Sequence, residues 1–256
     1  MSINAGDIMT EELTVFSHED RVGSSRETME EYGFDVAPVE ISGYVRKYVH
    51  IDDLQDVSST DRIVEHADTI EEHQLLGSDV PVIKITPGSR DLITILDERD
   101  MDFAFIVNDG IEGIITHADF NKVRAGTPLY RLISEYEEAV CDLIDQEVKH
   151  DRWLSLFDSE ERGELEAMYE EQKEENAELR MVECLNTRFL NKIILEYELW
   201  PELGFSDEDR AEEVLSEIKS FRDDVMHQRP VVGEHSFVEF VEIINDLKEV
   251  NQSLSE

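Results

Sequence analysis

The sequence predicts an α+β chain of several domains, with an N-terminal α/β part followed by an all-α helical bundle. Two observations support this prediction. Short runs rich in β-branched and aromatic residues alternate with helical stretches up to about residue 125, and the strand pattern disappears after residue 126. Strands that alternate with helices are typical of an α/β module, whereas apolar residues spaced three and four apart predict amphipathic helices. We therefore expect domains at residues 1–125 and 126–256.

The expected strands of the first domain are short and are bounded by Gly, Asp and Pro. They are VAPVEI (36–41), YVRKYV (44–49), PVIKI (81–85), FAFIV (103–107) and GIIT (113–116). The stretches RVGSSRETMEEYG and GSRDLITILDERD have Ser or Gly near their starts, which predicts helices between the strands.

The second domain is expected to contain four or five helices. The first helix is predicted to begin with Thr127 as N-cap and Pro128 at the first helical position. Ser206, which precedes three acidic residues, is the predicted N-cap of a later helix. The remaining helices are expected at about 159–177, 179–200, 206–227 and 235–252.

Acidic residues are spread along the whole chain. The 256 residues include 23 Lys and Arg against 62 Asp and Glu, and residues 1–125 alone hold 10 basic and 27 acidic residues. A shell this negative repels itself, and molar salt removes most of that penalty because it shortens the Debye length to about 3 Å. We expect a protein of a high-salt cytoplasm, with an acidic protein of an ordinary cell as the alternative.

Three classes of function are disfavoured by composition. No basic surface that could bind nucleic acid broadly is visible, and Cys141 and Cys184 form no CxxC pair and have no histidine at zinc-ligand spacing. The N-terminus has no basic segment followed by an apolar core, and no run of 18 apolar residues occurs. We therefore expect a cytoplasmic protein without a metal site or a membrane span.

Two segments of the first domain share one layout. Residues 27–54 and 92–120 each read as a helix, a short strand, a turn of small residues and a strand that runs into an acidic helix start. Aligned on their ends, YVHIDDL corresponds to IITHADF. An internal repeat of this kind predicts two similar structural units.

These repeats resemble a tandem pair of CBS (cystathionine-β-synthase) domains, also called a Bateman module. The opening GDIMTEELTVFSHED looks like the lead-in to a first repeat, and NDGIEGIITHADF is similar to the closing stretch of a repeat. The resemblance covers about residues 5–125, with repeats of βαββα type at about 5–60 and 75–125. The first repeat departs from the pattern, because Lys47 stands where glycine is usual and His50 where Thr or Ser is usual.

The resemblance implies clefts between the repeats that bind a regulatory adenosyl ligand, AMP, ATP or S-adenosyl methionine. A hydroxyl and a carboxylate three residues apart at a strand-to-helix turn suit ribose hydroxyls, so Thr116 and Asp119 are the first candidates. Their counterparts His50 and Asp53 form the second set. The alternatives are that Asp119 caps a helix while Thr116 ends a strand, and that the module serves only as a dimerisation scaffold.

The stretch FRDDVMHQRP in the helical domain resembles the motif of the HEPN superfamily, in which an Arg and a polar residue are followed by a His late in a helix. Arg222, Asp223 and His227 occupy those places. The resemblance implies a metal-independent ribonuclease whose site lies in a homodimer cleft. The histidine would move a proton, the arginine would stabilise the phosphorane and the aspartate would orient the pair.

Spacing alone does not join the arginine to the histidine. Five residues on a regular helix turn through about 500°, which places Arg222 and His227 about 140° apart. They converge only if the helix loosens after Met226 or a dimer partner closes the cleft. The alternatives are a basic helix end that suits the helix dipole, within a non-enzymatic binding and dimerisation protein, and a purely structural or antitoxin-like helical domain.

Overall fold

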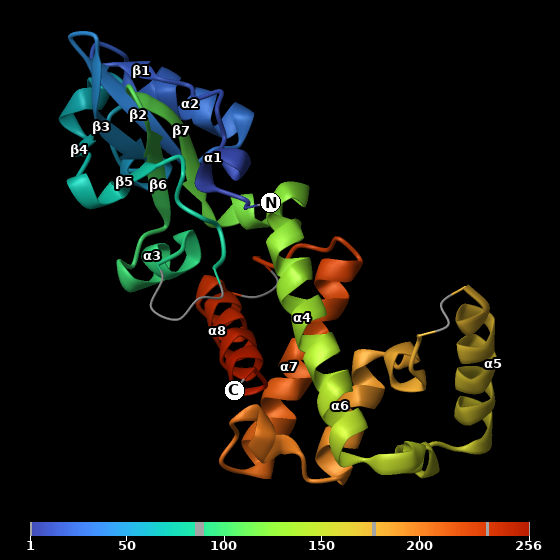
Figure 1. Ribbon diagram of the computed structural model, residues 1–256. Coiled ribbons are helices and arrows are strands. Elements are labelled where there is room, and N and C mark those ends of the chain that lie inside the picture. The colour runs from blue at the N-terminus through green and yellow to red at the C-terminus, as the bar shows by residue number, and fades with distance from the viewer. Residues whose placement is uncertain (1, 85–89, 176–177, 234–235, 256) are drawn as a thin grey trace. The chain divides into compact units, whose positions relative to one another are not determined.

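The strands of the N-terminal unit form two sheets (Figure 1). The computed structural model describes residues 2–84, 90–175, 178–233 and 236–255, and the chain divides at Arg124 and Ala125 into this unit and a helical unit. In sheet order, the first sheet contains β1 (Phe16–Ser17), β2 (Val36–Ile41), β3 (Tyr44–His50) and β4 (Asp68–Thr69). The second contains β5 (Leu75–Gly77), β6 (Phe103–Val107) and β7 (Ile111–Thr116).

The two sheets repeat one pattern of strand pairing. In each, a short strand runs parallel to the next (β1 with β2, β5 with β6), which then pairs antiparallel with its successor (β3 and β7). The register shifts at Val39/Glu40 in one sheet and at Ile106/Val107 in the other. The helices α2 (Val22–Tyr32) and α3 (Leu92–Glu98) precede the central strands. The predicted fold class, an α/β pair of repeats followed by a helical bundle, is confirmed.

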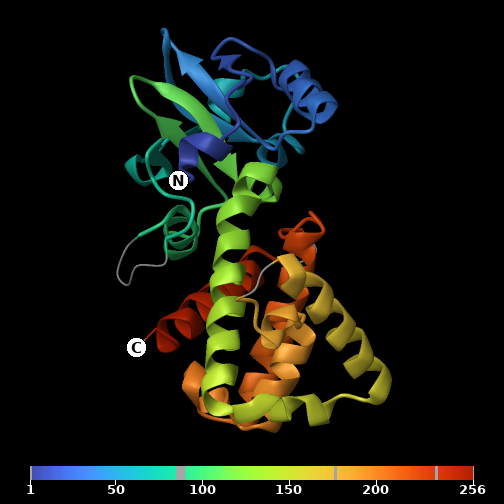
Figure 2. The same cartoon turned by 45° about the vertical axis from the view of Figure 1, so that its right-hand side comes forward.

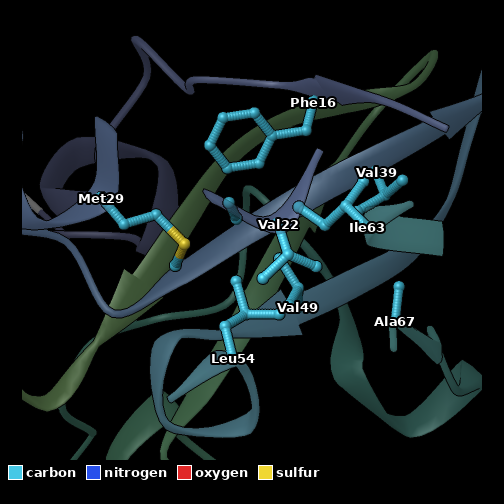
Figure 3. Packing of buried hydrophobic residues seen from close by; sticks show 9 residues of the cluster. Phe16, Val22, Met29, Val39, Val49, Leu54, Ile63 and Ala67 are labelled. Carbon is cyan, nitrogen blue, oxygen red and sulfur yellow. The ribbon is translucent and has the colours of Figure 1, made fainter. Parts of the chain in front are cut away.

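The segment that leads into each repeat pairs with the other repeat. We call residues 5–14, before β1, the first leading segment, and residues 63–74, before β5, the second leading segment. Thr10, which follows α1 (Ala5–Ile8), bridges to Ile114 of β7, and β4, which leads into the second repeat, pairs with β3 of the first. The core of the first repeat reflects this exchange. Its cluster of Phe16, Val22, Met29, Val39, Val49 and Leu54 is completed by Ile63 and Ala67 from the second leading segment (Figure 3).

Aromatic rings pack between the two sheets. Phe103 of the second repeat lies edge-on to Tyr48 of the first, with ring centroids 4.9 Å apart, and to Phe105, at 5.5 Å. Buried aromatic pairs of this geometry contribute about 0.5–1.5 kcal/mol beyond their area. These contacts hold the repeats together as one unit.

One strand expected in the N-terminal unit was wrong. The segment PVIKI is not a strand, since Pro81 makes only an isolated bridge to Asn4, while Ile85 lies outside the described residues. The parallel strand of the second repeat is instead Leu75–Gly77, which pairs with β6. An apolar run next to a proline predicts a strand poorly, because proline cannot donate a hydrogen bond to a ladder.

The helical unit contains α4 (Val123–Glu147), α5 (Ser159–Glu175), α6 (Thr187–Glu196), α7 (Glu208–Met226) and α8 (Phe237–Ser253). Buried side-chain hydrogen bonds join four of these helices, which lie side by side in Figures 1 and 2. Tyr136 Oη donates to Asn191 Oδ1 at 2.9 Å, Asn191 Nδ2 donates to the Leu215 carbonyl at 2.6 Å, and Asn251 Nδ2 donates to the Leu132 carbonyl at 3.1 Å. These bonds tie α4 to α6 and α8, and α6 to α7.

Several predicted helix starts were displaced. The first helix begins at Val123, so Thr127 is not its N-cap and Pro128 lies inside it, because the closing turn of the second repeat continues almost directly into the helix. Asp207, not Ser206, caps α7, since its carboxylate accepts from the Arg210 amide. The helix expected at 179–200 is broken into a short 3₁₀ helix and α6, which Asn186 caps. The start expected at 235 lies outside the described residues, and α8 begins after Ser236.

Within the described ranges, no helix combines the length and apolar content that crossing a membrane requires.

Candidate functional site

One cavity of about 1060 Å³ lies wholly within the N-terminal unit. Its wall takes residues from the first leading segment, from the entry to β2 and β6, and from the ends of β3 and β7. Three of the four predicted ligand residues, His50, Thr116 and Asp119, line it. The exposed Asp53 is not among its lining residues. The cavity is large enough for a nucleoside-sized ligand.

The repeat places His50 and Thr116 at equivalent positions. Thr116 is the N-cap of the 3₁₀ helix His117–Asn121, and His50 is the N-cap of the 3₁₀ helix Ile51–Leu54. The imidazole caps the 3₁₀ helix as a hydroxyl would, because its Nδ1 accepts a hydrogen bond from the Asp52 amide at 3.2 Å. A histidine therefore fits this turn, where the second repeat has the smaller Thr116.

Asp119 is 4% exposed and lies at the centre of a hydrogen-bond network. Its Oδ2 accepts from the Thr116 amide at 2.6 Å and from Thr116 Oγ1 at 3.1 Å. Its Oδ1 accepts from Thr10 Oγ1 at 3.2 Å and pairs with Lys122 Nζ at 2.5 Å. The carboxylate thus caps the turn, as the alternative interpretation expected, and it also faces the cavity.

Lys122 and Thr10 were not predicted as site residues. Lys122 stands three residues after Asp119, a spacing at which side chains on one helical face meet, so the sequence carried a signal for it. Thr10 reaches Asp119 from 109 positions away in the sequence. Only the exchange of leading segments between the repeats brings it there.

His117 borders the same cavity. Burial lowers its pKa, while the Met101 carbonyl, 3.0 Å from Nε2, and the nearby Asp102 carboxylate act in the opposite direction. Among the described residues, no group of three or more His, Cys, Asp or Glu side chains is arranged to hold a metal ion.

Two of the three predicted site residues of the helical unit, Arg222 and Asp223, form ion pairs. Arg222 Nε lies 3.2 Å from Glu137 Oε1 of α4, and its Nη1 lies 3.2 Å from Asp223 Oδ1. Lys219 Nζ contacts the other oxygen of Asp223 at 3.0 Å. Partial burial opposes ionisation of Asp223, but the bonds from Lys219 and Arg222 outweigh it and lower the pKa. This carboxylate therefore stabilises the fold above its unfolded pKa, and the contribution is lost as the pH falls.

His227 occupies the C-cap of α7. The helix is regular to Met226, and the chain then turns through Gln228 at φ 54°. The His227 side chain is exposed and makes no side-chain hydrogen bond to another described residue. Arg222 faces Glu137 instead, so the structure does not show the arginine and the histidine acting on one point.

Removal of Arg222 is expected to destabilise the helical unit. Arg222→Ala leaves the half-buried Glu137 without its cation, which we expect to lower the free energy of unfolding by about 1–3 kcal/mol. Arg131→Ala is the matched control, because Arg131 pairs with Glu135 on the same helix at an exposed site and should cost less than about 1 kcal/mol. Urea unfolding of both variants measures the difference, and equal losses would contradict a structural role for Arg222.

Comparisons with known proteins give matches among solved structures. No family model matches the chain, and no curated protein does. A conserved CBS domain protein of Thermoplasma acidophilum is 16% identical with a TM-score of 0.39, covering 48% of this chain and 70% of that one. The CBS domain of a bacterial CNNM/CorC family Mg²⁺ transporter in complex with ATP is 16% identical with a TM-score of 0.38, covering 45% and 82%. The CBS domains of a transcriptional regulator from Streptococcus pneumoniae are 16% identical with a TM-score of 0.37, covering 45% and 94%.

Proposed function

We propose that the N-terminal unit is a CBS-type sensing module that binds an adenosyl ligand and regulates the helical unit, in a homodimeric protein of a high-salt cytoplasm. The observation that supports this most is the convergence of His50, Thr116 and Asp119 on one cavity from corresponding ends of two repeated strands. A hydroxyl beside a carboxylate can hydrogen-bond both hydroxyls of a ribose.

Regulation requires a difference in affinity between two states. A ligand shifts an equilibrium only by as much as it binds one arrangement better than the other. The last ligand-site residues lie at 116–122, and α4 begins at Val123, so the cavity wall is covalently continuous with the first helix of the helical unit. A change at this turn would act directly on the start of α4.

Calorimetry on the full chain in molar salt tests the proposal. Adenosine should bind with saturable heat, and the midpoint of thermal unfolding should rise with its concentration because the ligand binds the folded state. The absence of both effects for adenosine, AMP, ATP and S-adenosyl methionine would overturn the proposal. Sedimentation of the same sample measures whether the protein is a dimer.

A ribonuclease of HEPN type is the second candidate for the helical unit. The exposure of His227 at the end of the helix that carries Arg222 and Asp223 favours it. The ion pairs of Arg222 and Asp223 favour instead the non-enzymatic alternative, a binding and dimerisation protein in which these residues and His227 have a structural role.

Replacement of His227 distinguishes the two candidates. If the histidine transfers a proton, His227→Ala should reduce metal-independent RNA cleavage by about 10²-fold or more, with the unfolding midpoint unchanged because the side chain is exposed. The measurement is cleavage of labelled RNA with a chelator present, at several salt concentrations. No cleavage by the wild-type protein would contradict a ribonuclease activity. Undiminished cleavage by the variant would contradict a catalytic role of His227.

A further inference from the structure

The cavity of the N-terminal unit carries an excess of negative charge. Glu12, Asp35, Asp102 and Asp119 all line it, and Lys122 is its single lysine or arginine among the described lining residues. Close to a protein surface, two unit charges about 4 Å apart interact by about 4 kcal/mol. A ligand with several phosphates would therefore enter against three carboxylates that Lys122 does not pair with.

Lys122 has no donor left for a phosphate. Its Nζ contacts Asp119 Oδ1 at 2.5 Å, the Ile8 carbonyl at 2.7 Å and Thr10 Oγ1 at 3.1 Å. An ammonium group has three N–H donors, so these three acceptors use its full capacity. The lysine acts as an internal counter-ion of Asp119, held in place by the first leading segment.

Asp119 is equally well satisfied. Its two oxygens accept from the Thr116 amide, Thr116 Oγ1, Thr10 Oγ1 and Lys122 Nζ, which fills about four lone-pair sites. A ligand hydroxyl can reach this buried carboxylate only by replacing one of these donors, among which Lys122 is the charged one. Displacement of Lys122 removes a positive charge beside a buried negative one, and a ligand that brings its own positive charge restores the balance.

We infer that the cavity selects an adenosyl ligand without net negative charge, and that Lys122 sets the balance between neutral and cationic ligands of this class. The inference rests on the proposed function and deepens it, because it names the charge class of the ligand. Adenosine and S-adenosyl methionine fit this class, and ATP does not. Selection by charge weakens as salt rises, since salt screens exposed charges first.

The test compares adenosine, S-adenosyl methionine and ATP by calorimetry on the full chain, at low and at molar salt. We expect ATP to bind about tenfold or more weakly than adenosine at low salt, with a smaller difference in molar salt. The double substitution Glu12→Gln and Asp102→Asn should raise the affinity for ATP about tenfold relative to the affinity for adenosine. ATP that binds as tightly as adenosine at low salt overturns the inference but not the proposed function, whereas binding of none of the three overturns both.

Lys122→Gln tests the role of the lysine. Because it leaves Asp119 without a counter-ion, S-adenosyl methionine should gain about tenfold over adenosine relative to the wild-type protein. Arg124→Gln is the matched control: it makes the same charge change two residues further on, at a residue that does not line the cavity, and should leave the ratio unchanged. An unchanged ratio in Lys122→Gln, with the circular dichroism spectrum intact, contradicts the inference.

Discussion

Asp119→Asn should weaken adenosine binding about tenfold or more while the protein remains folded. The amide keeps an acceptor for the Thr116 amide, so the turn stays capped, but the ribose loses a charged acceptor. Hydrogen bonds to charged groups are worth about 1.5–3 kcal/mol, and about 1.4 kcal/mol corresponds to tenfold in affinity. Isothermal titration calorimetry measures the loss, and circular dichroism checks the fold.

The internal repeat supplies the matched control for this experiment. Asp53 holds the position of Asp119 in the first repeat, as the third residue of the 3₁₀ helix, but it is exposed and lies outside the cavity wall. Asp53→Asn should leave the affinity for adenosine unchanged. Equal affinities of the wild-type protein and Asp119→Asn would show that Asp119 is only a capping residue.

Gly113→Ala should destabilise the N-terminal unit by about 1–3 kcal/mol. A methyl group at this position would lie 2.7 Å from Met9 Sδ and 2.8 Å from the Thr10 carbonyl oxygen, so the first leading segment has to move away from β7. Met9→Ala in the same chain should recover only part of the loss, because the Thr10 backbone remains in contact. The measurement is urea unfolding followed by tyrosine fluorescence.

Gly110→Ala is the control for this substitution. Gly110 lies in the turn between β6 and β7, and a methyl group there meets no atom within 4 Å. Its effect should stay within about 0.5 kcal/mol, as for most exposed substitutions. A loss at Gly110 equal to that at Gly113 would show that strand flexibility, and not the contact with Met9 and Thr10, determines the result.

The two repeats differ at one position, which Lys47 holds in the first repeat and Gly113 in the second. Lys47 faces Thr69 in the ladder and corresponds to Gly113, and the residue that corresponds to Met9 is Ala67. In the second repeat the large Met9 packs over Gly113, whereas in the first repeat the small Ala67 lies beside Lys47. Lys47 Nζ donates to the Ala67 carbonyl at 2.5 Å, so the lysine side chain binds the second leading segment to β3.

The repeat and the end of each repeat could be predicted from the sequence, because they depend on local features. Alternating strands and helices, the Asp-Gly turn and the Thr116–Asp119 spacing are all visible within short windows. The short parallel strands β1 and β5 were missed, since two or three residues give no periodic pattern. The start of α4 was missed because Pro128 looked like a first helical residue.

The composition of the cavity could be predicted only in part. Thr116, Asp119 and His50 follow from the motif, and Lys122 follows from helical spacing once Asp119 is chosen. Thr10 and Glu12 come from the first leading segment, which pairs with the second repeat through a contact that no local pattern encodes. The same limit applies to Arg222, whose partner Glu137 lies 85 positions earlier on another helix.

Hydrogen–deuterium exchange of the full chain, with and without saturating adenosine, tests the central claim most directly. The segments that line the cavity are separated in the sequence, at Thr10–Thr14, Tyr32–Val36 and Thr116–Asp119. We predict that adenosine slows exchange in all three segments together, because a ligand in the cavity contacts each of them. Protection confined to the end of α7, or no protection at these three segments under saturating ligand, would contradict a ligand-sensing site in the N-terminal unit.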